Sequence, residues 1–205
     1  MGRRPPRPLK RSGPKKPERY IIALFCEGAA TEPEYFQGLS RLPQVQERTL
    51  LDLRIDLTGA VPLTLVRQAI QAKARGTADE YWCIFDVEWP QHHPHLAEAI
   101  ALAKAKAIPI AVSNPAFELW LLLHFKDHQS HLNTDEAIRD RRSADLSTDK
   151  HLDPAKYMPL RAIAAARARN LGKRHASNGS FTPHDNPSSN VFDLVDAIER
   201  ARPSA

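Results

Sequence analysis

The 205-residue chain has little of what marks a secreted or membrane protein. It contains two cysteines, Cys26 and Cys83, and each lies in an apolar run, which predicts buried, reduced thiols. The longest apolar runs, 21–26 and 119–123, are far shorter than the ~20 residues of a membrane-spanning helix. The basic start leads into prolines and more bases, which is unlike a secretory signal. We therefore expect a cytoplasmic protein with no membrane contact.

Several common catalytic motifs are missing as well. The chain has only eight glycines and no Gly-rich phosphate-binding loop, which argues against that type of nucleotide site. It has no nucleophile-elbow motif, so Ser-His-Asp catalysis has no support. His92, His93 and His95 form a loop trio without a cysteine pair, so we interpret them as solvated residues rather than zinc ligands. His93 remains a candidate proton shuttle.

The net charge of +5 comes from one end of the chain. Residues 1–18 carry seven Lys and Arg, one Glu and five of the 17 prolines, which leaves 22 basic and 23 acidic residues for the rest. Such a segment cannot bury enough apolar surface to become ordered. We expect a disordered tail over 1–18 that either contacts nucleic acid electrostatically or only adds solubility.

From residue 19 onward the pattern alternates between short apolar runs and helical segments. Strands are predicted at 19–27, 51–57, 81–86 and 108–113, and helices at 31–42, 62–75 and 94–107. Thr31 and Glu34 fit a capping box. This order is typical of parallel βαβ units. We predict an α/β fold, with an open, mainly parallel four-stranded sheet flanked by helices over about 19–125. A helical part follows over about 126–205, with helices at 133–142, 153–171 and 190–202 and a loop at 172–189.

Acidic side chains follow the predicted strands at the edge where open α/β sheets bind ligands. Glu27 ends the first strand, Asp86 and Glu88 end the third, and Asn114 ends the fourth. Asp86 and Glu88 point the same way if the strand extends through both. Carboxylate oxygens suit Mg²⁺ or Mn²⁺, which can neutralise a phosphodiester and activate water. The strand ends therefore predict a metal or phosphate site.

Three motifs resemble the RloB family over about residues 20–200. They are Cys26-Glu27-Gly28-x-x-Thr31-Glu32-Pro33-x-Tyr35-Phe36, Phe85-Asp86-Val87-Glu88, and Asn114-Pro115-Ala116-Phe117-Glu118-Leu119-Trp120-Leu121-Leu122-Leu123-His124-Phe125. A closing segment, Asn186-Pro187-Ser188-Ser189-Asn190-Val191, is also similar. This family is similar to the Toprim fold of primases, topoisomerases and certain nucleases. It is linked to bacterial restriction and abortive-infection loci, beside a gene for an AAA- or ABC-type ATPase.

The resemblance implies a Toprim-like, Mg²⁺- or Mn²⁺-dependent nuclease that acts as an antiviral toxin on RNA, including transfer RNA, or on DNA. Glu27 matches the general acid/base or metal-ligand glutamate, and Asp86 and Glu88 match the Asp-x-Asp metal pair. Glu88 departs from the usual Asp, and Ala29 and Ala30 replace a commonly polar pair. The alternative is therefore a non-catalytic adaptor that binds nucleic acid or the partner ATPase. A homo-oligomer is compatible with either.

Other residues are candidates for contact with the metal or the substrate. Thr31 and Glu32 belong to the first motif. Glu118 lies in an apolar helix, where it would bond to backbone, bridge to a base such as His124, or reach the metal. Asn114 is interpreted as a helix N-cap or a substrate contact. For nucleic acid, the candidate contacts on the helix at 153–171 and in the loop after it are Arg167, Arg169, Lys173 and Arg174.

Overall fold

The computed structural model describes residues 19–28, 30–55 and 61–201, so the predicted tail at 1–18 lies outside the described residues. Its centre is one sheet with the order β2-β1-β3-β4-β5. The strands are β1 (Tyr20–Cys26), β2 (Thr49–Ile55), β3 (Glu80–Asp86), β4 (Ile110–Asn114) and β5 (Ser188–Ser189). The first four are parallel, and β5 runs antiparallel to β4. The predicted mainly parallel α/β sheet is confirmed, but the strand number was wrong because two serines give no strand signal.

Helices connect the strands and fill the second half of the chain. They are α1 (Thr31–Ser40), α2 (Pro43–Gln46), α3 (Pro62–Arg75), α4 (Leu96–Ala105), α5 (Phe117–Phe125), α6 (Thr134–Asp145), α7 (Pro154–Tyr157), the 3₁₀ turn η1 (Met158–Leu160), α8 (Arg161–Ser177) and α9 (Val191–Arg200). The helix predicted at 153–171 is divided by Pro159, whose ring removes a backbone donor. The region predicted as a loop from 172 begins instead with the last turn and a half of α8.

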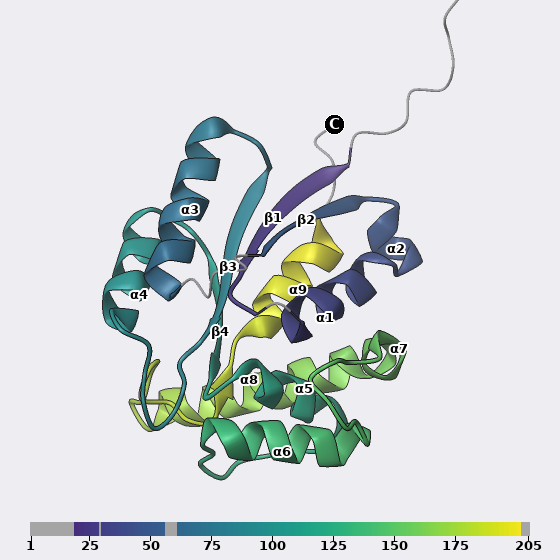
Figure 1. Cartoon of the computed structure of the whole chain (residues 1–205), viewed down its shortest axis with the longest axis vertical. Coiled ribbons are helices and arrows are strands. Elements are labelled where there is room, and N and C mark those ends of the chain that lie inside the picture. The colour runs from purple at the N-terminus through teal and green to yellow at the C-terminus, as the bar shows by residue number, and fades with distance from the viewer. Residues whose placement is uncertain (1–18, 29, 56–60, 202–205) are drawn as a thin grey trace, which may run out of the picture.

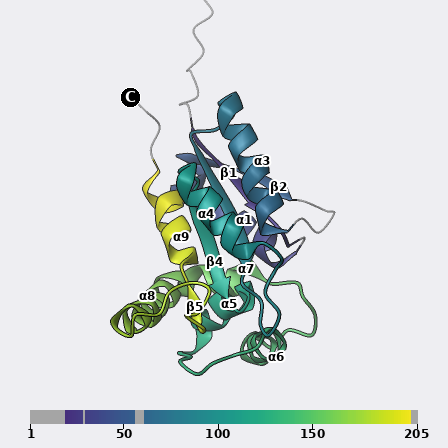
Figure 2. The same ribbon diagram turned by 90° about the vertical axis from the view of Figure 1, so that its left-hand side faces the viewer.

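Both faces of the sheet are covered, as the apolar strands require. Alternate residues of β1 point to opposite faces: Ile22 and Leu24 join one core cluster, and Ala23 and Phe25 join the other. The second cluster is formed with α3 and α4, which lie on one side of the sheet, whereas α1 and α9 lie on the other (Figure 1). Seen from the α3 and α4 side, the helices α5, α6 and α8 lie beyond one end of the sheet (Figure 2).

The buried helix α5 joins these two parts of the molecule. Phe117 and Trp120 are fully buried, as predicted, and both rings pack edge-on against Tyr35 of α1. His124 is also buried, with its Nδ1 3.0 Å from the Trp120 carbonyl oxygen and its Nε2 3.2 Å from the Tyr35 hydroxyl. Burial lowers the pKa of His124 to about 4, so the ring is neutral at physiological pH.

A buried arginine fixes the segment between α6 and α7. Arg141 is 1% exposed, and its guanidinium donates to the Ser147 hydroxyl and to the carbonyl oxygens of Asp149 and His151. Its Nε lies 3.2 Å from a carboxylate oxygen of Asp145, which also accepts a hydrogen bond from the Tyr157 hydroxyl. This network connects α6, the segment that follows it and Tyr157 of α7.

The free side of β4 is completed by a side chain rather than by a long strand. β5 pairs only with Ser113 and Asn114. Beyond it, the Asn190 side-chain amide accepts from the Val112 backbone N–H at 2.6 Å and donates to the Ile110 carbonyl at 3.0 Å. The Asn190 backbone N–H donates to Val112 as well. Asn190 thus continues the ladder for two more residues of β4.

Candidate acidic site at the carboxyl edge of the sheet

The predicted site residues lie at one edge of the sheet because the strands that carry them end together. Cys26 of β1 pairs with Ile84 of β3, and Asp86, the last residue of β3, pairs with Ser113 of β4. Glu27 therefore follows β1 at the level where β3 ends. Figure 1 shows this carboxyl edge facing α5, α6 and α8. It is the edge at which open parallel sheets bind ligands.

Asp86 is the centre of a group of carboxylates, which we call the acidic cluster: Glu27, Glu32, Asp86, Glu88 and Glu118. Burial raises the pKa of Asp86 well above its usual range, and the negative charges of the four glutamates raise it further. Among the four glutamates, the charge of Glu32 has the largest effect on the pKa of Asp86 and the charge of Glu88 the smallest. The structure thus brings Glu27, Asp86 and Glu88 within electrostatic range, and it adds two more carboxylates.

Glu32 reaches the cluster from the first turn of α1 and is only 5% exposed. Its Oε2 accepts a 2.8 Å hydrogen bond from the Thr31 hydroxyl. The carboxylate lies directly against Gly28, where an added Cβ would be 2.0 Å from Oε2. Burial raises the pKa of Glu32, and hydrogen bonds from its own backbone N–H and from Thr31 partly offset that rise. Sequence reasoning listed Glu32 only as a neighbour of the site and missed this position.

The predicted capping box at the start of α1 is wrong. Thr31 is the first residue of the helix, Ala30 is the N-cap, and no side chain caps it. Glu34 points elsewhere: its carboxylate accepts from the Leu152 backbone N–H at 2.8 Å and pairs with the His151 ring. A buried partner for Glu34 and an acidic neighbour for Thr31 outweigh the local capping preference.

Glu88 departs from the strand geometry on which its predicted direction depended. β3 ends at Asp86, and Glu88 has a φ of 60°, in the left-handed region. Its backbone N–H donates to the Pro115 carbonyl oxygen at 2.8 Å, which fixes the turn against the start of α5. A non-glycine residue in this region costs on the order of 1 kcal/mol or more and is commonly found at functional sites. Asp86 and Glu88 therefore do not share a strand face.

The His93 ring lies against two members of the acidic cluster. Its Nε2 lies 3.2 Å from Oε2 of Glu27 and 3.7 Å from Oε2 of Glu88. The hydrogen bond to Glu27 raises the pKa of His93, burial opposes that rise, and the charges of Glu27 and Glu88 add to it. The residue proposed from sequence as a proton shuttle therefore connects two of the three predicted metal ligands.

The donor set suits a hard divalent cation in its chemistry. All five members of the acidic cluster offer oxygen, the ligand type of Mg²⁺ and Mn²⁺, and the mutual repulsion at Asp86 is of the kind that a cation relieves. In the described ranges, however, no three His, Cys, Asp or Glu side chains converge closely enough to hold an ion. Side chains of Glu27 and Glu88, now paired with His93, would have to turn toward Asp86.

Glu118 lies in the first turn of α5 and is partly buried. Burial raises the pKa of Glu118, whereas a hydrogen bond from its own backbone N–H and the charges of Arg141 and Arg142 lower it. The suggested bridge to His124 is not formed, because both nitrogens of that ring face Tyr35 and Trp120. Glu118 thus connects the acidic cluster electrostatically to the arginines of α6.

Asn114 is not the N-cap of α5, a position that Ala116 occupies. It ends β4, is 1% exposed, and its Nδ2 donates to the Pro183 carbonyl and to Oδ1 of Asp185. Its Oδ1 has no hydrogen-bond partner in the described part of the chain. Asn114 therefore fixes the segment before β5 to the carboxyl edge of the sheet.

The four predicted nucleic-acid contacts on α8 differ in their exposure and in their bonds to the rest of the fold. Arg167 donates to the carbonyl oxygens of Leu123 and His124 at the end of α5. Arg169 pairs with Asp196 at 2.6 Å and lies over the Phe192 ring. Lys173 and Arg174 are exposed at the far end of the helix. The first two arginines therefore hold the fold together, and the last two residues face solvent.

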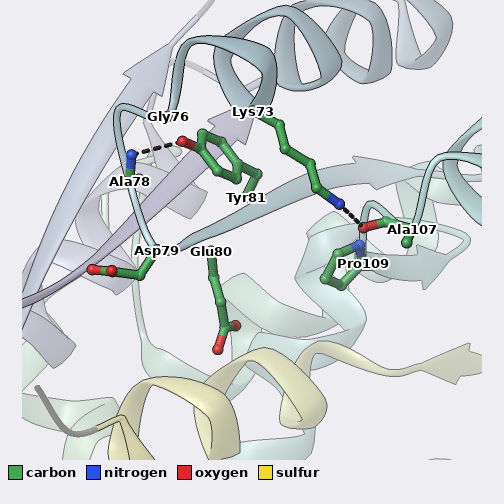
Figure 3. Close-up of a pocket in the computed structure, with 8 residues that line it drawn as sticks. All are labelled: Lys73, Gly76, Ala78, Asp79, Glu80, Tyr81, Ala107 and Pro109. Carbon is green, nitrogen blue, oxygen red and sulfur yellow. Dashed lines mark hydrogen bonds between the residues drawn. The ribbon is translucent and has the colours of Figure 1, made fainter. Parts of the chain in front are cut away.

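The cavity shown in Figure 3 lies at the opposite, amino edge of the sheet. It has a volume of about 390 Å³ and is lined by Lys73, Gly76, Ala78, Asp79, Glu80, Tyr81, Ala107 and Pro109. Its polar groups are already in use: Lys73 donates to the Ala107 carbonyl, and Asp79 accepts from the Ile21 backbone N–H. The Glu80 carboxylate accepts from Tyr20 and Trp82. Because these polar groups are bonded within the protein, we take the acidic cluster, and not this cavity, as the candidate site.

Sequence reasoning also passed over Trp89, which follows Glu88 directly. Its backbone N–H donates to the Thr134 hydroxyl, and its carbonyl oxygen accepts from the Thr134 backbone N–H, both at 3.1 Å. These two bonds hold the loop after β3 against the start of α6. The sequence signal for Trp89 was its position between Glu88 and Pro90, directly after the predicted third strand.

The comparisons with known proteins give one result. The family model described as RloB-like protein matches residues 22–198, which is most of the chain. The searches of curated proteins and of solved structures gave no match. Among the described helices, none combines the length and the apolar character needed to cross a bilayer.

Proposed function

The chain belongs to the RloB-like protein family, and from this premise we propose that it is a Mg²⁺-dependent nuclease. Its substrate would be RNA, including transfer RNA, or DNA. The observation that carries the proposal is the acidic cluster, in which four glutamates lie within electrostatic range of Asp86 at the carboxyl edge and His93 Nε2 lies near Glu27 and Glu88. The resemblance of the first and second motifs to Toprim nucleases supports the same chemistry.

Glu27, Asp86 and Glu88 are the residues that would hold the ion. When bound, Mg²⁺ supplies positive charge that neutralises a phosphodiester and acidifies a water nucleophile. His93 Nε2 lies 3.2 Å from Glu27 and 3.7 Å from Glu88, and the protonated ring would act as the acid that protonates the departing oxygen. Glu32 and Glu118 keep the surroundings of Asp86 negative, which favours cation binding over an empty site.

The biological setting is part of the proposal and rests on family resemblance. We propose a cytoplasmic toxin of a bacterial antiviral system that acts together with an AAA- or ABC-type ATPase encoded nearby. RNA is preferred over DNA by the same analogy. Of the four predicted nucleic-acid contacts, Lys173 and Arg174 are the two exposed ones, and their contribution to phosphate binding would weaken with added salt.

The test is cleavage of mixed RNA and DNA pools by the full chain with Mg²⁺, Mn²⁺ or EDTA. The double variant Asp86→Asn, Glu88→Gln keeps side-chain size and removes both charges, and we expect it to abolish cleavage while circular dichroism stays unchanged. The matched control is Glu98→Gln, since Glu98 is an exposed acid of α4 outside the acidic cluster whose carboxylate pairs with Arg67 and His95. Undiminished cleavage by the double variant would refute the assignment.

A non-catalytic adaptor is the second candidate, and one observation favours it. Within the ranges the structure describes, no three side chains form a ready metal site, and His93 lies between Glu27 and Glu88. Calorimetric titration with Mn²⁺ separates the candidates. Heat of binding that disappears in the double variant supports the nuclease, whereas no heat and no cleavage of either pool support the adaptor.

A further inference from the structure

Trp89 is an aromatic side chain exposed beside the acidic cluster. It is 38% exposed, whereas Trp82 is 7% exposed and Trp120 is fully buried. It follows Glu88, whose carboxylate is 44% exposed. Trp89 belongs to neither core cluster of the described residues, so the packing of the core does not explain its place.

The ring is held in place by its neighbours. Both backbone groups of Trp89 are bonded to Thr134, the first residue of α6. The His131 ring lies edge-on to the indole at a centroid distance of 5.1 Å, and the His92 ring is tilted against it at 5.5 Å. A ligand that stacks on such a prearranged ring loses little affinity to ordering the protein.

We propose that Trp89, with His92 and His131 beside it, is a stacking platform for an unpaired nucleobase next to the bond that is cut. This inference rests on the proposed nuclease function and deepens it by naming the substrate as single-stranded nucleic acid or a nucleotide extruded from a duplex. Aromatic rings bind bases of any sequence through their π-faces, whereas a base inside a duplex offers no free face.

Two basic side chains of α8 lie near the loop that carries His131. The segment between α5 and α6 carries His131, and two residues earlier Gln129 accepts hydrogen bonds from Arg174 of α8 through its backbone and side-chain oxygens, at 3.3 and 3.2 Å. Lys173 is exposed beside Arg174. We expect Arg174 and Lys173 to contact phosphates of a strand that stacks one base on Trp89.

A protein partner is a weaker occupant for this surface. The other exposed large hydrophobic residues in the described ranges lie on different elements: Leu50 on β2, Leu146 after α6, Ile163 on α8 and Phe181 before β5. None belongs to the loops of residues 87–95 or 126–133, so Trp89 is an isolated ring rather than part of an apolar patch. Protein interfaces need a larger contiguous surface.

The tryptophan fluorescence of the full chain provides the test. Because the other two tryptophans are buried, quenching by an added oligonucleotide reports on Trp89. The probes are a 12-nucleotide oligouridylate and an RNA duplex of the same length with blunt ends, both titrated in EDTA so that no cleavage is needed. We expect quenching by the single strand and little by the duplex.

Two variants define the expected affinities. Trp89→Phe keeps an aromatic face and should bind the single strand nearly as well as the original chain, whereas Trp89→Leu keeps apolar bulk without that face. We expect Trp89→Leu to lose about 5- to 150-fold in affinity for the single strand, the range of one lost base stack. Leu50→Ala is the matched control, since Leu50 is an exposed apolar residue that pairs with Ile21 near the amino edge.

The outcomes distinguish failure of the stacking platform from failure of the proposed nuclease function. Absent quenching, equal affinities of Trp89→Leu and the original chain, or an equal loss for the duplex would overturn the platform. A Trp89-dependent dimer in sedimentation, without quenching by either probe, would assign the ring to a second copy instead. Binding through Trp89 without cleavage under any metal would refute the nuclease alone, and full cleavage by Trp89→Leu would refute the platform alone.

Discussion

Gly28→Ala tests the packing of the acidic cluster most directly. Gly28 is not in the left-handed region, so alanine can adopt its backbone conformation. The added methyl group would lie 2.0 Å from Oε2 of Glu32 and 2.5 Å from the two other carboxylate atoms, well inside contact distance. Glu32 cannot yield cheaply, because it is 5% exposed, bonded to Thr31, and faces like charges on Asp86 and its neighbours. We expect Gly28→Ala to reduce stability by about 1–3 kcal/mol, the usual cost of overpacking.

Gly28→Ala should increase the free energy of unfolding, rather than lower it, once the Glu32 carboxylate is removed. The three atoms nearest to the new methyl group all belong to the Glu32 side chain, so a Glu32→Ala background removes the closest clashes. Alanine then stabilises by restricting the unfolded chain, by about 0.4–1 kcal/mol. The four proteins form a double-mutant cycle with a coupling of about 1.5–4 kcal/mol.

Urea unfolding at pH 7 in metal-free buffer measures all four stabilities. Gly38→Ala is a comparison case, since its methyl group would meet Pro154 at 2.3 Å and should destabilise with or without Glu32. If Gly28→Ala costs the same in both backgrounds, the carboxylate does not lie against Gly28 and the cluster geometry is wrong.

Three further changes test the electrostatics of the fold. Asp86→Asn should raise the urea midpoint at pH 7 without metal, because the raised pKa of Asp86 means that its ionised form destabilises the fold. The difference in midpoint should shrink as pH falls, since Asp86 of the original chain is then protonated. His124→Gln should be less stable than the original chain at pH 7, but the difference should narrow by about 3 kcal/mol from pH 6.5 to pH 4. The pKa of His124 falls from 6.5 to about 4 on folding, so the stability that the neutral ring contributes is lost as pH drops through that window. If the stability difference between His124→Gln and the original chain stays constant with pH in urea unfolding, His124 is not buried as a neutral ring. Arg141→Met should cost about 3–5 kcal/mol in the same assay by leaving Asp145 unpaired, and a loss under 1 kcal/mol would show that the arginine network is dispensable.

The sequence was most informative where local pattern and tertiary structure agree. The buried strands β1, β3 and β4 are apolar runs bounded by helical segments, and a parallel sheet follows from their order. That order also places the residues after each strand at one edge, so Glu27 and Asp86 could be brought together without coordinates. Asn133 and Asp153, at the start of two predicted helices, cap α6 and α7 by accepting hydrogen bonds from residues two or three positions later in the chain.

What could not be predicted depends on contacts between distant segments. β5 exists only because Ser188 and Ser189 meet the end of β4. The direction of Glu32 depends on the close approach of α1 to Gly28, and that of Glu88 on a bond to the Pro115 carbonyl. Periodicity carries none of this information, since each case joins residues that are separated along the chain or placed outside regular structure.

The amide of Asn190 determines how this sheet can meet other chains. By bonding Val112 and Ile110, it occupies the backbone groups that an incoming strand would need along β4. Intermolecular strand addition, whether in an orderly assembly or in aggregation, is therefore blocked on that flank over these residues. β2 is the outermost described strand at the other flank, so any strand addition to this sheet would have to occur there.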